Sequence, residues 1–216
     1  CRTSSKKRHD TSSRNSSVTD RLNRAKGANA LGFDHSYARL GPAFSTPQAP
    51  DPVSDPRLLL WNQNLADTLG WSGDPQSDAA QLAALAGNTP LRDSHPIATV
   101  YAGHQFGQYN PQLGDGRATL LGEWLTPSGE RFDVQLKGAG PTAYSRGGDG
   151  RSPIGPVIRE YLVSEAMFTL GVPSTRALAA IATGEPVIRN QIEPGAILTR
   201  VASSHLRVGT IQYFAM

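Results

Sequence analysis

The hydrophobic and polar positions of the chain are most regular in its middle. Residues 118–125 are mostly apolar and predict a strand, and residues 126–130 have the composition of a turn. Residues 131–137 then alternate apolar with polar side chains, which predicts a half-buried strand. We therefore predict a β-hairpin that ends at Lys137.

Two stretches nearer the N-terminus have the period of an amphipathic helix. Residues 57–69 place three leucines and Trp61 on one stripe, and Gly70 would end a helix there. A second, shorter helix is predicted over residues 78–86. Residues 27–56 are rich in Pro, Gly and aromatic side chains, which favours an extended, ordered loop.

A longer helix is predicted over residues 153–170. Ser152 is suited to cap its first turn, the proline that follows is suited to the first helical position, and Gly171 would end it. Its expected buried face consists of Ile154, Val157, Ile158, Tyr161, Leu162 and Met167.

The last part of the chain predicts strands around residues 175–183 and 196–202, and a helix that begins near Gly209. The predicted order is thus a glycine-rich turn, a hairpin that carries a lysine, a helix and further strands. Protein kinases have this order in their small lobe. We therefore expect an α+β fold with a protein-kinase-like small lobe.

Composition divides the chain into three parts. Residues 1–26 predict a disordered basic tail, residues 27–100 an N-terminal extension with short helices, and residues 101–216 an incomplete kinase-like nucleotide-binding lobe. The tail holds eight Lys or Arg against two Asp, whereas residues 27–216 hold thirteen Lys or Arg against sixteen Asp or Glu. The net charge of +3 therefore comes from the tail, which could also be a nucleic-acid-binding arm or a transit peptide.

Several classes of protein are disfavoured by composition. No apolar run approaches the roughly 18 residues that cross a bilayer. The single cysteine, Cys1, allows no disulfide framework within the chain and no cysteine-based metal site. The sequence contains no Gly-x-Ser-x-Gly, His-Glu-x-x-His or phosphate-binding GxxxxGK[ST] motif.

Lys137 is the first candidate for a role in chemistry. It is the only lysine between residues 27 and 216, against twelve arginines, and it follows the Gly114–Arg117 turn by twenty residues. A kinase-like lobe places its phosphate-binding lysine at such a position and holds it with a carboxylate from the following helix. Glu160, which borders the buried stripe, is the first choice for that carboxylate, and Glu165 is the second.

Glycines and arginines supply the other candidates. Gly114 and Gly116 would let the backbone approach a phosphate, although a glycine turn that opens a hairpin needs no ligand. Residues 144–151, with three glycines and two arginines, are either mobile or wrapped around an anion. Arg200 lies in a strand expected to be buried, so it needs a partner: a ligand phosphate, Glu193 or Asp149. We interpret His104 and His205 as structural, because their spacing does not match a metal site.

Five segments are long and sharply spaced: FDHSYARLGP (33–42), YAGHQFGQYNPQLGDGRATLLGE (101–123), QLKGAGPTAYSRGGDGR (135–151), REYLVSEAM (159–167) and LTRVASSHLRVG (198–209). Together they resemble the selenoprotein O family, also called SelO or YdiU. The resemblance runs from about Gly32 to Met216 and leaves out the basic tail.

The resemblance implies a protein-kinase-like fold that binds ATP in a reversed orientation. It implies transfer of AMP, rather than phosphate, to Ser, Thr or Tyr hydroxyls of proteins, with release of pyrophosphate and the assistance of Mg²⁺ or Mn²⁺. The Lys–Glu pair of the family corresponds to Lys137 and Glu160. Its ATP-binding positions correspond to Gly114, Gly116, Arg117, Lys137, Asp149, Gly150, Arg200 and Arg207.

The catalytic aspartate and the metal ligands of the family come later in its sequence, so we expect them beyond Met216. We therefore assign no catalytic or metal-binding residue and expect residues 1–216 alone to be inactive. The expected partners are ATP and substrate proteins, without a membrane. The expected location is the bacterial cytoplasm, or the mitochondrion for a eukaryotic protein.

Two other functions stay open. The chain could belong to an ordinary kinase-like phosphotransferase, which labelling with α- or γ-phosphate-tagged ATP would separate from AMP transfer. It could also be a nucleic-acid-binding module that uses residues 1–26. The balance of −3 in residues 27–216 argues against nucleic acid.

Overall fold

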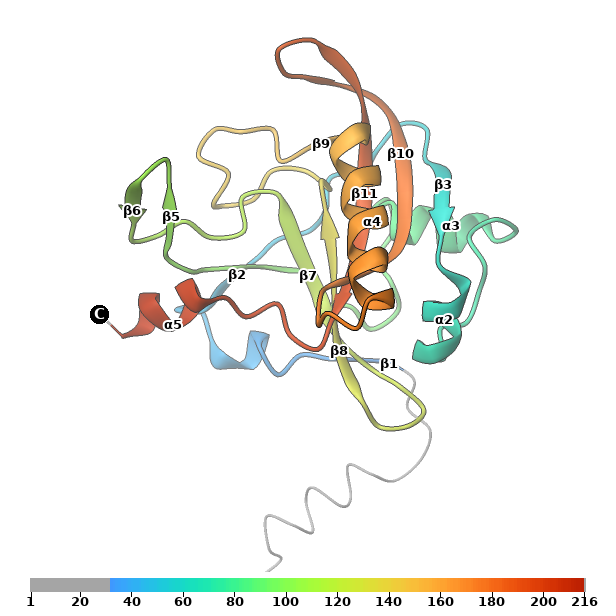
Figure 1. Ribbon diagram of the computed structural model, residues 1–216, viewed down its shortest axis with the longest axis horizontal. Coiled ribbons are helices and arrows are strands. Elements are labelled where there is room, and N and C mark those ends of the chain that lie inside the picture. The colour runs from blue at the N-terminus through green and yellow to red at the C-terminus, as the bar shows by residue number, and fades with distance from the viewer. Residues whose placement is uncertain (1–31, 216) are drawn as a thin grey trace, which may run out of the picture.

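The computed structural model describes residues 32–215, which form an α+β fold built on a large antiparallel sheet (Figure 1). Within this range nine strands join in the order β2-β4-β7-β8-β11-β10-β3, with β1 beside β7 and β9 beside β11, and β5 and β6 form a separate hairpin. The strands are β1 (Gly32–Asp34), β2 (Ser45–Pro47), β3 (Arg57–Trp61), β4 (Ile97–Thr99), β5 (Gly103–Gln105), β6 (Gln108–Asn110), β7 (Ala118–Leu125), β8 (Arg131–Lys137), β9 (Ser152–Pro153), β10 (Arg176–Ile188) and β11 (Ile192–Ala202).

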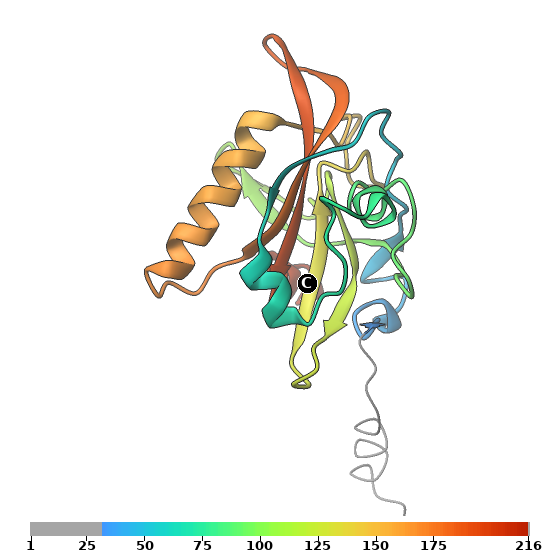
Figure 2. The same ribbon diagram turned by 90° about the vertical axis from the view of Figure 1, so that its right-hand side faces the viewer.

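Helices cover both faces of the sheet (Figure 2). Val157 of the longest helix packs with Ala180 and Leu198 on one face, whereas side chains of two shorter helices pack with Leu136 and Ile197 on the other. Neighbouring residues of a strand point to opposite faces, so β10 and β11 contribute to both cores. The helices are α2 (Gln63–Leu69), α3 (Ala79–Leu85), α4 (Ile154–Thr169) and α5 (Val208–Phe214), and Ala38–Leu40 forms a short 3₁₀ helix, η1.

The hairpin predicted at residues 118–137 is confirmed as β7 and β8, with Ala118 opposite Lys137. The prediction that residues 131–137 form a half-buried strand is only partly right. The apolar face of β8 packs into the core, but Gln135 on the polar face is 1% exposed as well. Both faces of β8 are therefore covered at Gln135, and the half-buried Lys137 lies on the same face two residues later.

The helix predicted over residues 57–69 is wrong in its first half. Residues Arg57–Trp61 are strand β3, which pairs with β10, and the helix begins only after Asn62. The side chain of Asn62 accepts a hydrogen bond from the Leu65 amide at 3.1 Å and caps α2. Pairing with the edge of the sheet thus overrides the helical spacing of the apolar residues.

The predicted long helix is confirmed as α4, but two details differ. Ser152 does not cap it, because Ser152 pairs with Ala196 in the sheet and Pro153 stands at the cap position. Of the expected apolar face only Val157 is fully buried, while Leu162 is 57% exposed. The apolar stripe of α4 is therefore wider than the surface it buries.

The sheet continues across residue 100. Strands β1, β3 and β4 come from the predicted extension and pair with strands of the predicted lobe, and β2 joins the sheet through β4. Strands β10 and β11 are longer than the sequence indicated. The helices predicted at residues 78–86 and near Gly209 are confirmed as α3 and α5. The basic tail of residues 1–26 lies outside the described residues. No helix among residues 32–215 is long and apolar enough to cross a membrane.

Glu165 fixes the end of α4 against the sheet. Its carboxylate accepts two hydrogen bonds from Arg176, at 2.8 and 2.7 Å, one from Asn62 at 2.7 Å and one from the Ala177 amide at 3.0 Å. Burial by itself would raise the pKa of Glu165, but these hydrogen bonds outweigh it and hold the pKa below its usual value. Glu165, the second choice of partner for Lys137, is therefore engaged elsewhere.

We expect Glu165→Gln to lower the free energy of unfolding by about 2 kcal/mol at neutral pH. Because the folded pKa is depressed, this stabilisation is present above the unfolded value of 4.5 and is lost as the pH falls through the folded pKa. Urea unfolding of both proteins at neutral pH and at about pH 4 checks this. A stability difference that stays constant between the two pH values would contradict it.

Candidate functional site

All eight sequence-predicted ATP-binding positions line one cleft of about 530 Å³. The cleft lies where β7, β8 and β11 meet the glycine-rich loop of residues 138–151 and the loop that leads to α5. It is also lined by four residues of the loop 144–151, which the sequence predicts to be either mobile or wrapped around an anion: Tyr144, Ser145, Arg146 and Gly148. The remaining lining residues had no predicted role: Tyr101, Gln105, Leu113, Asp115, Ala118 and Arg189.

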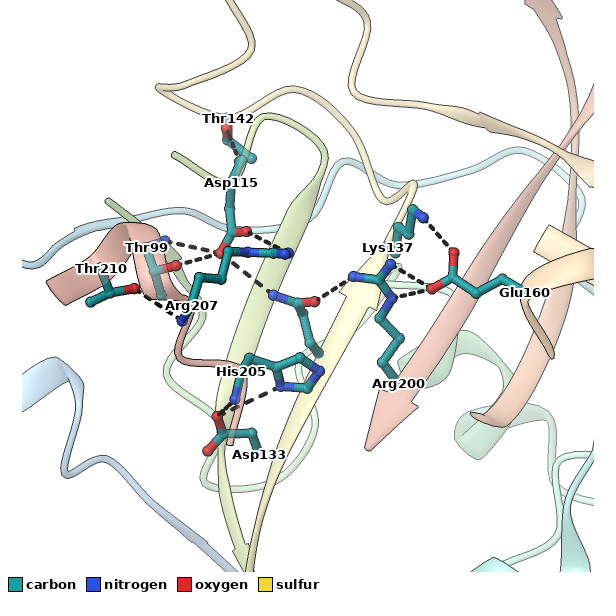
Figure 3. Close-up of polar contacts among 11 residues, drawn as sticks. Thr99, Asp115, Asp133, Lys137, Thr142, Glu160, Arg200, His205, Arg207 and Thr210 are labelled. Carbon is teal, nitrogen blue, oxygen red and sulfur yellow. Dashed lines mark hydrogen bonds and ion pairs between the residues drawn. The ribbon is translucent and has the colours of Figure 1, made fainter. Parts of the chain in front are cut away.

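Lys137 faces the cleft and is bound by the carboxylate of Glu160 from α4 (Figure 3). The same carboxylate accepts a hydrogen bond from Arg200 Nε at 2.5 Å and forms an ion pair with its Nη2, so one anion serves two cations. Arg200 directly follows Thr199 in β11 and lies opposite Gln135 of β8. The side chain of Gln135 is uncharged, so it does not balance the charge of Arg200. Neither Glu193 nor Asp149, the two protein partners considered for Arg200, is bound to it.

The charges around Lys137 are unbalanced. Burial, and then the neighbouring Arg200 guanidinium, lower the pKa of Lys137, while Glu160 opposes the shift. For Glu160, burial would raise the pKa, but Arg200 and Lys137 outweigh it and keep the carboxyl ionised. An additional anion next to Lys137 would therefore stabilise its charged form.

Gly114 and Gly116 open the strand β7 with a turn that another loop covers. A Cβ atom at Gly114 would lie 2.3 Å from the ring of Tyr144, and one at Gly116 would lie 2.9 Å from the Tyr144 carbonyl. Ser145 donates a hydrogen bond to the Gly116 carbonyl at 2.6 Å. The close approach of this loop thus accounts for the two glycines, in addition to any ligand they admit.

Asp149 and Gly150 line the cleft from the glycine-rich loop. Gly150 has a φ of +64°, and a Cβ there would lie 1.9 Å from the Gly140 carbonyl, so this position requires glycine. Two hydrogen bonds from Arg189, at 2.7 and 2.9 Å, hold the pKa of Asp149 below its usual value. Residues 144–151 are thereby tied to the hairpin between β10 and β11.

Arg207 and Arg117 complete the cationic lining. Arg207 precedes α5, lies 3.9 Å from the buried carboxylate of Asp115 and stacks over the ring of Tyr101. Arg117 is exposed and has no ion-pair partner among residues 32–215. Six cations line the cleft against two carboxylates, which is the charge distribution expected of a polyanion site: Arg117, Lys137, Arg146, Arg189, Arg200 and Arg207.

The residues of the cleft do not form a site for Mg²⁺ or Mn²⁺. Among residues 32–215 no three His, Cys, Asp or Glu side chains gather as metal ligands. Of the two carboxylates in the lining, Asp149 is bound by Arg189 and Asp115 is buried among hydrogen-bond donors. We therefore derive no step through a metal ion.

His104 and His205, which we interpret as structural from the sequence, both lie next to other side chains of the chain. The His205 amide donates to Asp133 at 2.6 Å, and its ring is largely buried next to the same carboxylate. The ring of His104 lies 5.0 Å from the ring of Tyr109 in the β5–β6 hairpin.

Three polar residues of the site were missed by sequence reasoning: Asp115, Gln135 and Arg189. A signal existed for Gln135, because the period of a strand places it on the same face as Lys137. Asp115 lies between the two glycines that were singled out, but the sequence does not indicate that a carboxylate in such a turn is buried. Arg189 reaches the cleft only because β10 and β11 form a long hairpin, which the sequence did not indicate.

The sequence of the chain matches a known family over all of the described residues. The chain belongs to the family described as protein adenylyltransferase SelO, which it matches over residues 28–216. The resemblance noted in the sequence is thereby confirmed.

Curated relatives are named protein nucleotidyltransferase YdiU. One from Maridesulfovibrio salexigens is 59% identical over 183 residues, which cover 85% of this chain and 37% of that protein. One from Rhizobium rhizogenes is 60% identical over 184 residues, which cover 85% of this chain and 36% of that protein. One from Bacillus cereus is 57% identical over 183 residues, with 85% and 37% covered. The chain thus spans little more than a third of the length of these relatives.

Proposed function

We propose that this chain supplies the ATP-binding part of a protein adenylyltransferase. The observation that carries the proposal is the junction of Lys137, Glu160 and Arg200 at the base of a cationic cleft, in a chain that belongs to the SelO family. The strand-borne lysine held by a carboxylate of the next helix also supports a protein-kinase-like lobe. ATP and proteins with Ser, Thr or Tyr hydroxyls are the substrates that we propose.

In this reaction the oxygen of a substrate hydroxyl attacks the α-phosphorus of ATP. A new oxygen–phosphorus bond forms, the bond between the α-phosphorus and the bridging oxygen to the β-phosphate breaks, and pyrophosphate leaves. The hydroxyl proton passes to a base that we expect outside this chain. Lys137, Arg200 and Arg207 would stabilise the negative charge that develops on the departing pyrophosphate.

The alternative is transfer of the γ-phosphate, because a Lys–Glu pair of this kind also serves kinases. The nucleotide orientation decides between the two reactions, since either the α- or the γ-phosphate must lie next to the acceptor hydroxyl. The cationic lining of the cleft suits a triphosphate in both cases.

We expect the full-length protein to incorporate label into protein from α-phosphate-labelled ATP and not from γ-phosphate-labelled ATP, with release of pyrophosphate. Gel autoradiography of parallel reactions with the two labels measures this. Incorporation from the γ-label alone would replace AMP transfer by phosphotransfer, and incorporation from neither would reject the proposed function. Residues 1–216 alone are expected to bind ATP at most, without transfer.

A further inference from the structure

Gln135 links the two halves of the cationic cluster. It is 1% exposed, and its side chain contacts both Asp115 and Arg200. Its Oε1 accepts a hydrogen bond from Arg200 Nη1 at 3.1 Å, and its Nε2 lies 3.4 Å from Asp115 Oδ2. One buried amide thus contacts the carboxylate next to Arg207 and the guanidinium next to Lys137.

The surroundings fix the orientation of this amide. A guanidinium only donates hydrogen bonds, so the carbonyl oxygen of Gln135 must face Arg200. An ionised carboxylate only accepts, so the amino group must face Asp115, which also accepts from Thr99 Oγ1 at 2.6 Å. The reversed amide would place donor against donor and acceptor against acceptor.

The sheet itself delivers Gln135 to this place. The pairing of β8 with β11 sets Gln135 directly opposite Arg200 and sets Lys137 opposite Leu198. Glu160 holds the Nε and Nη2 side of Arg200, while Gln135 holds Nη1. Without Gln135, Arg200 would be held from the side of Glu160 only.

We propose that Gln135 is a positioning residue for ATP binding: it sets the direction of Arg200 and, through Asp115, couples it to Arg207. The proposal rests on the proposed function, because it assumes that these arginines contact the triphosphate. The distances between cations must match the spacing of phosphate groups, and a fixed amide between two charged groups maintains that spacing. Gln135 itself needs no contact with ATP.

The competing explanation is structural: Gln135 would only satisfy polar groups inside the sheet. A structural role predicts a less stable protein with fewer active molecules, which lowers kcat and leaves the KM and Kd for ATP unchanged. A positioning role predicts a weaker hold on ATP in molecules that are folded. Affinity for ATP therefore separates the two explanations.

The first test compares Gln135→Met with the unchanged full-length protein. Methionine preserves the volume but removes both hydrogen bonds, so we expect the Kd and the KM for ATP to rise about tenfold. Thr199→Val is the matched control: Thr199 neighbours Arg200, is fully buried, and its hydroxyl has no partner among residues 32–215. This control should keep the ATP affinity of the unchanged protein. Calorimetry gives Kd, and melting curves identify folded variants.

The second test uses Gln135→Glu at several pH values. A protonated glutamic acid can accept from Arg200 and donate to Asp115, as the amide does, whereas the ionised form confronts Asp115 with a second negative charge. The charged groups around this position are Asp115, Arg200, Glu160, Lys137 and Arg207. Burial, together with the charge of Asp115, raises the pKa of Tyr101 to about 12, so Tyr101 stays protonated at the pH values of this test. The ratio of variant to unchanged Kd should fall toward one as the pH is lowered, and the Gln135→Met ratio should stay constant.

The outcomes distinguish the two proposals. An unchanged protein that binds no ATP rejects the proposed function and this inference together. An unchanged protein that binds ATP and transfers AMP, while folded Gln135→Met retains its Kd and KM, rejects the positioning role alone. A Gln135→Glu ratio that does not respond to pH also rejects it.

Discussion

Lys137→Met in the full-length protein is expected to lower AMP transfer by about two to three orders of magnitude. Lys137 is the cation at the junction of the cleft, and the loss of one preorganised donor to a developing anion typically costs on the order of 3 kcal/mol. Without Lys137, Glu160 would pair with Arg200 alone and neutralise its charge. The ligand would then lose the attraction of a second cation. Both effects act in the same direction.

Lys137→Arg is expected to lower AMP transfer nearly as much as Lys137→Met does. A guanidinium is planar and donates in a fixed fork, whereas the ammonium group of Lys137 fits a space already occupied on one side by the Arg200 guanidinium. Such a requirement would account for the one lysine among twelve arginines in residues 27–216. Activity in Lys137→Arg within a few-fold of the unchanged protein would show that charge alone is sufficient there.

The control for these variants is Arg159→Ala. Arg159 precedes Glu160 in α4, is exposed, and lies outside the cleft. Its removal tests the loss of a cation from the same helix without a change in the cleft. Label incorporated from α-phosphate-labelled ATP, measured as an initial rate, should stay close to that of the unchanged protein. Undiminished labelling by Lys137→Met would reject the role of Lys137.

Local patterns predicted those parts of the fold that local physics determines. The alternation in residues 131–137 identified β8, because a strand with one apolar face has that pattern wherever it lies. Residues 57–61 were assigned to a helix because Trp61 has helical spacing to the leucines around it. Their actual state depends on β10, a partner more than a hundred residues away, whose pairing no local pattern encodes.

The candidate site shows the same division. Lys137 and Glu160 could be proposed from the position of a lone lysine and a helix face. The sharing of Glu160 with Arg200 could not, because it depends on the register between β8 and β11. The strand period places Gln135 on the same face as Lys137, but only its burial opposite Arg200 identifies it as part of the site.

The second large effect is expected from Glu160→Gln, which should lower kcat about a hundredfold. The carboxylate accepts from Lys137 with one oxygen and from Arg200 with the other. An amide keeps a single acceptor, so its amino group must face one of the two cations as donor against donor. At least one cation is therefore displaced. The loss of a negative charge makes the cleft more positive, so we expect the affinity for ATP to fall less than kcat does.

Glu160→Gln should also shift the alkaline limb of the pH–rate profile. Burial and the charges of Arg200 and Arg117 lower the pKa of Lys137, and Glu160 is the group that opposes them. Without that carboxylate the pKa falls further, Lys137 loses its proton at a lower pH, and activity declines earlier as the pH rises. The matched control is Glu165→Gln, which removes a carboxylate from the same helix but from the Arg176 contact. It should lower stability and leave the profile in place, and an unshifted profile for Glu160→Gln would mean that Glu160 does not maintain the charge of Lys137.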